Sequence, residues 1–168
     1  TKLGRYEIRS KLGEGGMGEV YLAEDTRLHR KAALKVLPAE LAANKDRMRR
    51  FEQEAQAAAA LNHPNIVSVH DVGLEDGVPF IVMEYVRGET LSAQLRRGPV
   101  SRDRALQIGS EIATALVEAH AHNVAHRDLK PGNVLLAAAP GSDAAAPTPK
   151  VADFAVAALL AESPRFAT

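Results

Sequence analysis

The pattern of apolar residues changes at Arg87-Gly88, and this change limits the folds that the chain can adopt. Before it, short apolar segments alternate with glycine-rich or charged turns, as in strands. After it, apolar residues recur every three or four positions, as in amphipathic helices. The 168 residues, 46% of them apolar, are enough to bury a core. We therefore expect an α+β protein in which residues 1–86 and 87–168 form two structural units.

The first unit is predicted to contain five strands and one helix. The helix is expected from its cap, Asn44, to Leu61, because Met48, Phe51 and Ala55 recur on one face. The first three strands are expected to form an antiparallel meander. The expected strands cover residues 6–8, 20–22, 33–37, 66–72 and 78–86.

The second unit is predicted to begin with two helices, a short one capped by Thr90 and a longer one capped by Ser101. A strand pair, 134–136 and 150–152, should follow, joined by the low-complexity loop 137–149. The apolar face of the longer helix is expected to comprise Ala105, Ile108, Ile112, Ala113, Leu116 and Ala119.

Charge and composition exclude several classes of protein. Lys and Arg total 21 and Asp and Glu total 21, so there is no basic excess for nucleic acid or an anionic membrane surface. The absence of cysteine excludes disulfides, a thiolate nucleophile and a cysteine-based zinc site. No apolar run approaches the roughly 18 residues of a membrane span, and the start lacks a signal-peptide pattern. We expect a cytoplasmic protein.

A glycine-rich segment between the first two strands, Gly13-x-Gly15-x-x-Gly18-x-Val20, allows backbone amides to approach phosphates closely. The glycines run into a strand rather than a helix, which argues against a dinucleotide-binding fingerprint. No Gly-Lys-Ser/Thr sequence is present, which argues against a P-loop. By itself, the segment is equally compatible with a flexible hairpin turn.

A single lysine, Lys35, stands in an otherwise apolar strand, where an unpaired ammonium would be costly unless it meets an anion. Glu54, on the predicted helix, could be its partner. Alternatively, both side chains could lie on solvated faces, which is the commoner fate of single charged residues.

A third motif reads His126-Arg127-Asp128-Leu129-Lys130-Pro131-Gly132-Asn133, and Asp153-Phe154 follows it. With the glycine segment, Lys35 and Glu54, these residues stand in the order of the eukaryotic-type (Hanks-type) protein kinases, which the sequence resembles. The resemblance is greatest to bacterial Ser/Thr kinases. It implies a bilobal fold, with a five-stranded antiparallel N-lobe carrying one helix and a partial, mainly helical C-lobe.

The resemblance also implies that ATP and Mg²⁺ are cofactors and that a protein with a Ser/Thr acceptor is the substrate. Among the catalytic residues it implies, Asp128 accepts the hydroxyl proton, Lys130 steadies the phosphoryl group, and Lys35, steadied by Glu54, contacts the phosphates. Oxygen ligands for magnesium come from Asn133 and Asp153. The implied nucleotide contacts are Gly13, Gly15 and Gly18 at the phosphates, Leu12, Val20, Ala33 and Leu135 at the adenine, and a hinge at Glu84-Tyr85-Val86 behind the gatekeeper Met83.

The sequence departs from the family at two places. Ala155 replaces the glycine of Asp-Phe-Gly and should restrict the backbone movement of Phe154. The chain also ends at Thr168, within the expected activation segment. Both features leave a nucleotide-binding pseudokinase open as an alternative to an active kinase, and a partial C-lobe makes self-association possible. A third alternative, an interaction protein that binds no nucleotide, is disfavoured by the intact motifs.

The histidines His120, His122 and His126 could suggest a metal cluster, but their spacing near a helix end and the lack of cysteine favour structural roles. We predict no transition-metal site.

Overall fold

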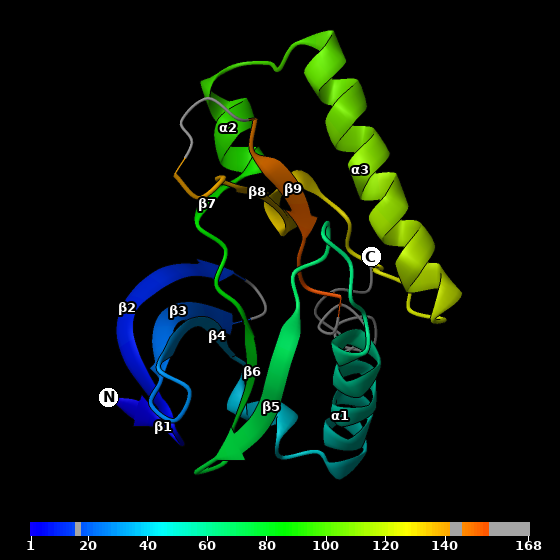
Figure 1. The fold of residues 1–168 in the computed structure, drawn as a ribbon. Coiled ribbons are helices and arrows are strands. Elements are labelled where there is room, and N and C mark those ends of the chain that lie inside the picture. The colour runs from blue at the N-terminus through cyan, green and yellow to red at the C-terminus, as the bar shows by residue number, and fades with distance from the viewer. Residues whose placement is uncertain (16–17, 142–145, 155–168) are drawn as a thin grey trace.

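The computed structural model describes residues 1–15, 18–141 and 146–154. Its larger sheet is antiparallel and curled, as Figure 1 shows, with the strand order β1-β2-β3-β4-β6-β5. The five predicted strands are present, and a two-residue strand, β1, adds an edge next to β2. The strands are β1 (Lys2–Leu3), β2 (Tyr6–Gly15), β3 (Gly18–Asp25), β4 (Arg30–Val36), β5 (Val69–Glu75) and β6 (Val78–Glu84).

Strand β5 begins at Val69, three residues later than predicted. The preceding residues pair elsewhere: the Val67 amide donates to the Val151 carbonyl at 2.9 Å, and the Val151 amide donates to the Asn65 carbonyl at 2.8 Å. The apolar segment 66–72 is therefore divided between two sheets, which its pattern alone could not indicate.

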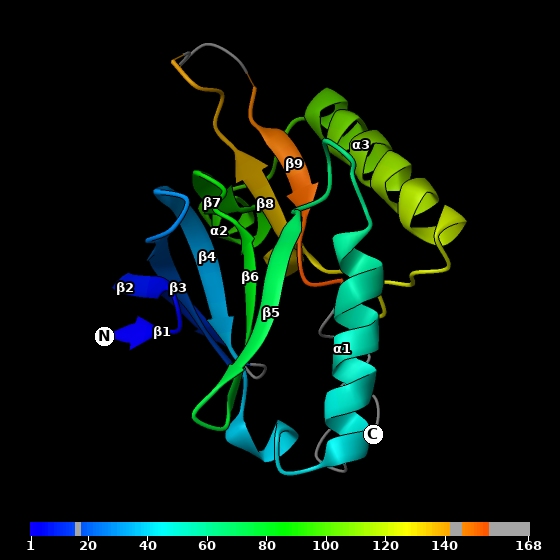
Figure 2. The ribbon, with the colours of Figure 1, turned by 60° about the horizontal axis from the view of Figure 1, so that its bottom comes forward.

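Helix α1 (Lys45–Ala59) covers one face of this sheet and runs alongside β5 (Figure 2). Its predicted cap is confirmed, because the Asn44 side chain accepts hydrogen bonds from the Asp46 and Arg47 amides. A short 3-10 turn, Ala39–Leu41, connects β4 to α1. The buried residues of α1 are Phe51, Ala55 and Ala58.

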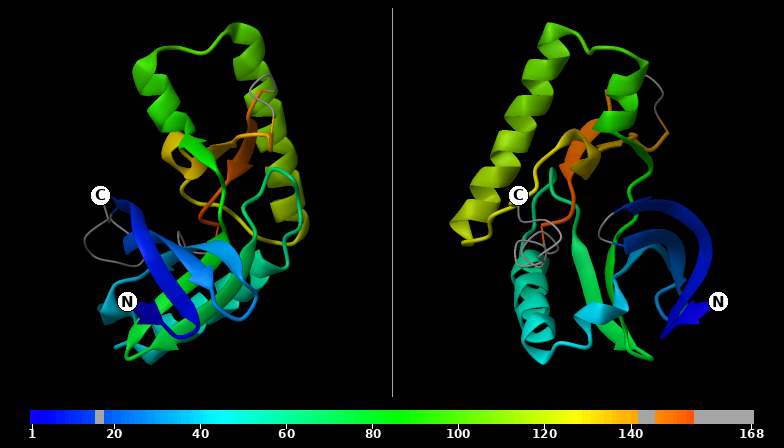
Figure 3. Two further views of the ribbon diagram at one scale, coloured as in Figure 1. Left: turned by 60° about the vertical axis from the view of Figure 1, so that its left-hand side comes forward. Right: turned by 180° about the vertical axis from the view of Figure 1, so that it is seen from behind.

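The second sheet is small and has the order β7-β8-β9. Figure 3 shows that this sheet lies with α2 and α3 at one end of the molecule, while the larger sheet and α1 form the other end. The predicted caps Thr90 and Ser101 both accept a backbone hydrogen bond. The elements are β7 (Gly88–Thr90), α2 (Leu91–Arg97), α3 (Arg102–Ala121), the 3-10 turn Pro131–Asn133, β8 (Val134–Ala137) and β9 (Thr148–Val151).

The apolar face of α3 differs in part from the prediction. Ile108 and Ala119 are buried as expected, whereas Ala105 and Ala113 are exposed. Ala115, which was not predicted to belong to this face, is also buried. The difference arises because β9 packs along one side of α3, so the buried stripe is narrower than the apolar one. None of the described helices is long and apolar enough to cross a membrane.

The main core is continuous between the two ends of the molecule. Residues of α1 and β6, such as Phe51 and Ile81, share one buried cluster with Ala115 of α3, Val151 of β9 and Phe154. This shared core positions the end of β9 against β4 and β6. Ala155 and Thr168, at which the sequence departs from the kinase pattern that it resembles, lie outside the described residues.

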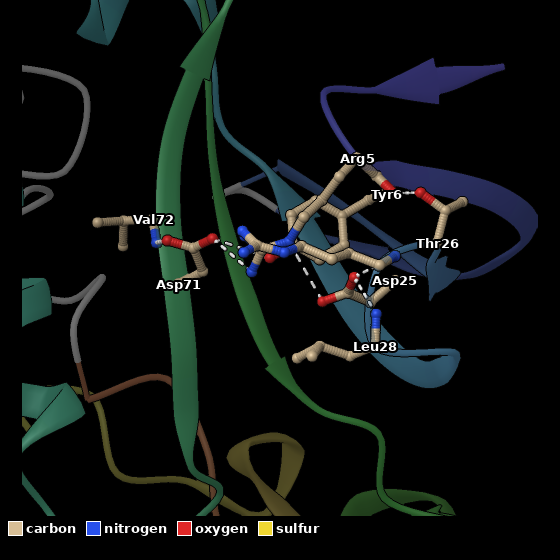
Figure 4. A network of polar contacts seen from close by, with 8 residues as sticks. Arg5, Tyr6, Asp25, Thr26, Leu28, Asp71 and Val72 are labelled. Atoms are coloured by element: carbon tan, nitrogen blue, oxygen red, sulfur yellow. Dashed lines mark hydrogen bonds and ion pairs between the residues drawn. The ribbon is translucent and has the colours of Figure 1, made fainter.

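A polar network joins the N-terminal hairpin to β5 (Figure 4). The Tyr6 hydroxyl donates to Asp71 Oδ2 at 2.8 Å, and the Arg5 guanidinium lies between Asp71, at 3.1 Å, and Asp25, at 3.2 Å. Asp25 is 1% exposed, and its Oδ1 accepts hydrogen bonds from the amides of residues 27 and 28. The carboxylate thus satisfies the backbone of the turn between β3 and β4.

These contacts shift the pKa values of Asp25 and Tyr6. Burial acts to raise the pKa of Asp25, but the two backbone hydrogen bonds and the Arg5 charge outweigh it, so this pKa lies below its ordinary value of 3.8. Burial and the hydrogen bond to Asp71 raise the pKa of Tyr6 to about 12. Asp25 therefore stabilises the fold above its unfolded pKa, and the contribution is lost as the pH falls through the lower folded value.

We predict that Asp25→Ala lowers the free energy of unfolding at pH 7 by about 2–3 kcal/mol, because the two turn amides and Arg5 lose the buried carboxylate that is their partner. Urea unfolding of both proteins measures the effect, and the difference should shrink as the pH falls below the ordinary Asp value. The control is Glu24→Ala, which removes an exposed pair with Arg9 and should change stability by less than about 0.5 kcal/mol. Equal midpoints for Asp25→Ala and the wild type would contradict the prediction.

Candidate active site

The glycine-rich segment forms the hairpin between β2 and β3, where Gly13 lies opposite Val20 and Gly15 opposite Gly18. Gly18 has a φ of +124°, and a Cβ there would lie 1.9 Å from the Val36 carbonyl oxygen. A Cβ on Gly13 would meet no atom within 4 Å. The fold itself therefore requires Gly18, whereas it does not require Gly13.

Most of the residues predicted to contact adenine lie in the main core or pack against it. Val20, Val86 and Leu135 pack against the buried cluster that contains Ala33 and Met83. They come from β3, β4, β8 and the segment after β6, so residues that are distant in sequence share this core. Leu12, on β2, is 47% exposed, and Glu84 ends β6.

Lys35 is buried on β4, and its ammonium pairs with a residue that follows β9. The distance between Lys35 Nζ and Asp153 Oδ2 is 3.0 Å, and the two side chains are 6% and 18% exposed. Since Asp153 follows β9, the ion pair joins the larger sheet to the smaller one. Asp153 has a φ of +67°, a left-handed conformation that is uncommon outside glycine and is frequent at functional sites.

In the structure, Lys35 pairs with Asp153 and not with Glu54, the partner predicted for it. Glu54 Oε1 lies 3.4 Å from Arg127 Nη1, and no Lys35–Glu54 ion pair occurs among the described side chains. The buried setting of Lys35 and Asp153 strengthens their attraction, while Glu54 and Arg127 remain partly exposed. Arg127, for which the sequence suggested no role, also has a left-handed φ of +64°.

The loop between α3 and β8 gathers three of the predicted catalytic and metal-binding side chains. The Asn133 side-chain amide donates to the Asp128 carbonyl oxygen at 2.8 Å and to Asp128 Oδ2 at 3.2 Å. Lys130 Nζ lies 3.3 Å from the same carboxylate oxygen, and Lys130 is largely exposed. A buried asparagine therefore orients a carboxylate that an exposed ammonium approaches.

His126 connects this loop to the strand before Asp153. Its Nδ1 accepts a hydrogen bond from the Asp128 amide at 3.2 Å, so the neutral ring donates from Nε2 to the Ala152 carbonyl at 2.7 Å. The ring also lies edge-on to Phe154, with centroids 4.7 Å apart. The histidine has the structural role expected of it, and it positions both Asp128 and the Asp153 segment, which the sequence did not indicate.

Asn133 and Asp153 present oxygen atoms suited to a hard cation. The Asn133 amide nitrogen is bound to Asp128, and Lys35 pairs with one Asp153 oxygen. Among the described residues, no hydrogen bond is made to the side-chain oxygen of Asn133. A hydrogen bond of 2.8 Å from the Ala152 amide to the Asn133 carbonyl holds the two segments together. These donors fit magnesium. Within the described ranges, no group of three or more His, Cys, Asp or Glu side chains forms a metal site.

The protein kinase domain family matches residues 6–168. The chain belongs to this family. It is 47% identical over 134 residues to the serine/threonine-protein kinase PrkC of Bacillus subtilis, covering 79% of this chain and 21% of PrkC. It is 45% identical over 164 residues to PknB of Mycolicibacterium smegmatis, covering 95% of this chain and 25% of PknB.

The crystal structure of the Mycobacterium tuberculosis PknI kinase domain is similar, with a TM-score of 0.80 and 34% identity. The match covers 93% of this chain and 62% of that domain. These similarities confirm the predicted α+β kinase fold, with a curled antiparallel N-lobe sheet, one helix and a partial C-lobe, and the relation to bacterial Ser/Thr kinases. The chain spans about a quarter or less of the two curated relatives.

The glycine hairpin gives a prediction that separates folding from binding. Gly18→Ala should lower the free energy of unfolding by about 1–3 kcal/mol, because φ is left-handed and the Val36 carbonyl is too close. Gly13→Ala should leave stability unchanged, because a Cβ there meets no other atom. It should weaken ATP binding if the phosphates lie against the backbone of this glycine, as the kinase motif implies. Thermal unfolding and ATP titration of both variants test this. Equal destabilisation by the two substitutions, or unchanged ATP binding by Gly13→Ala, would contradict the prediction.

Proposed function

We propose that the chain carries the nucleotide-binding and catalytic part of a serine/threonine protein kinase, which transfers the γ-phosphoryl group of ATP to a Ser/Thr hydroxyl of a protein. The observation that carries this proposal is the convergence of Lys35, Asp153, Asn133 and Asp128 from distant parts of the chain. Family membership and identities near 45% to bacterial Ser/Thr kinases support it.

The geometry suits phosphoryl transfer, which requires positioned phosphates, neutralised charge and an aligned acceptor. Lys35 supplies a buried positive charge next to Asp153. Magnesium held by Asn133 and Asp153 would neutralise phosphate charge when bound. Asp128, held by Asn133, accepts the proton of the substrate hydroxyl, and Lys130, beside it, steadies the transferred group.

A nucleotide-binding pseudokinase that acts as a scaffold or allosteric regulator is the second candidate. It is favoured by Ala155 and by the pairing of Glu54 with Arg127 rather than with Lys35. The two candidates share nucleotide binding and differ only in phosphate transfer.

The proposal also covers the domain boundaries and the location of the chain. Residues 1–86 would form the N-lobe, and residues 87–168 would form part of the C-lobe. Both would lie in the cytoplasm. The substrate would be a protein with a Ser/Thr acceptor. Self-association would involve the exposed apolar side chains of α3, which include Leu106 and Val117.

We predict that Asp128→Asn reduces phosphate transfer to a generic acceptor protein by about 10²- to 10⁴-fold, the usual contribution of a general base. ATP binding should be retained, because Asp128 contacts the acceptor rather than the nucleotide. The assay measures transfer of radiolabelled phosphate in the presence of Mg²⁺. The control is Asp103→Asn, in the exposed first turn of α3, which should transfer phosphate like the wild type.

Undiminished transfer by Asp128→Asn would contradict the assignment of the base. Magnesium-dependent ATP binding without any transfer by the wild type would instead favour the pseudokinase.

A further inference from the structure

Glu84 and Lys150 form an ion pair to which the proposed chemistry assigns no role. Glu84 ends β6, Lys150 lies in β9, and the two residues are 66 positions apart. Lys150 Nζ is 2.8 Å from Glu84 Oε1, and the side chains are 18% and 29% exposed. Partial removal from solvent makes such a pair stronger than an exposed one.

Glu84 is also fixed on the side of the larger sheet. Its Oε2 accepts a hydrogen bond from the Ser68 amide at 3.3 Å, and its own amide donates to the Ser68 carbonyl at 2.9 Å. The backbone and both carboxylate oxygens of Glu84 are therefore held, so the start of the predicted hinge has little freedom to move.

Lys150 is equally well fixed on the side of the smaller sheet. It lies opposite Leu135 of β8, a predicted adenine contact. The next residue, Val151, is hydrogen-bonded to the backbone of residues 65 and 67. Asp153, the predicted magnesium ligand, follows three residues after Lys150. The ion pair thus joins two parts of the proposed site. One is β9, which leads to the predicted magnesium ligand Asp153, and the other is the predicted hinge, which begins at Glu84 and would contact adenine.

We propose that Lys150 is a positioning residue, whose ion pair with Glu84 holds the hinge against β8 and β9 and thereby increases nucleotide affinity. The inference rests on the proposed nucleotide site. Adenine bound between the hinge and Leu135 needs these two segments at a fixed separation. If the ion pair already holds them there, binding loses less conformational entropy. Removing the ammonium also leaves one carboxylate oxygen of Glu84 without its charged partner.

The test compares variants of the full chain by calorimetric titration with MgATP. Lys150→Met, which keeps the length of the side chain but not its charge, should weaken binding by about 5- to 30-fold. Lys150→Arg should restore most of the affinity. The control Arg9→Met removes an exposed pair between β2 and β3 and should bind like the wild type. If Lys150→Met does not fold, Glu84→Gln should show the same loss of affinity.

Amide hydrogen exchange gives a second readout that needs no nucleotide. Exchange at Ser68 and Glu84, whose amides make the hydrogen bonds described above, should be faster in Lys150→Met than in the wild type. Unchanged or tighter MgATP binding by folded Lys150→Met overturns the proposal. If the wild type itself binds no nucleotide, the proposed function and the effect on affinity both fail. Hydrogen exchange then tests only whether the ion pair positions the hinge. Unchanged exchange rates at the Ser68 and Glu84 amides would overturn that part of the proposal.

Discussion

The ion pair between Lys35 and Asp153 is the contact on which the arrangement of the site depends. A buried ammonium is tolerated only where an anion compensates its charge, and β4 places Lys35 where the segment after β9 supplies one. The larger sheet and the smaller one must therefore keep a fixed relation near this point. The shared core, in which Phe51 and Ile81 pack with Val151 and Phe154, maintains that relation.

Around this ion pair, backbone hydrogen bonds hold the functional side chains in place. His126 binds the amide of Asp128 and the carbonyl of Ala152, while the carbonyl of Asn133 accepts from the Ala152 amide. The loop that carries the proposed base and the segment that carries the proposed metal ligand are thus one connected unit. Side chains that are already held in place need not reorient as charge develops in a transition state.

Much of the fold was predictable because its signals are local. The caps Asn44, Thr90 and Ser101 follow from side-chain chemistry at helix starts, and the spacing of the motifs indicated which residues share a site. The partners within the site were less predictable. Glu54 pairs with Arg127 rather than with Lys35, and residues 65–67 pair with Val151 rather than extending β5, because both outcomes depend on how distant segments pack.

Lys35 and Asp153 are proposed to form the phosphate and metal end of a nucleotide site. Calorimetric titration with ATP, with Mg²⁺ or with chelator, tests this assignment most directly in the wild type, in Lys35→Met and in the control Lys31→Met, which changes an exposed lysine of the same strand. We predict that each chain binds one ATP and that binding is weaker with chelator. Affinity should fall about tenfold or more in Lys35→Met and should not fall in Lys31→Met. Absence of binding by the wild type, or equal affinity in folded Lys35→Met, would contradict the assignment.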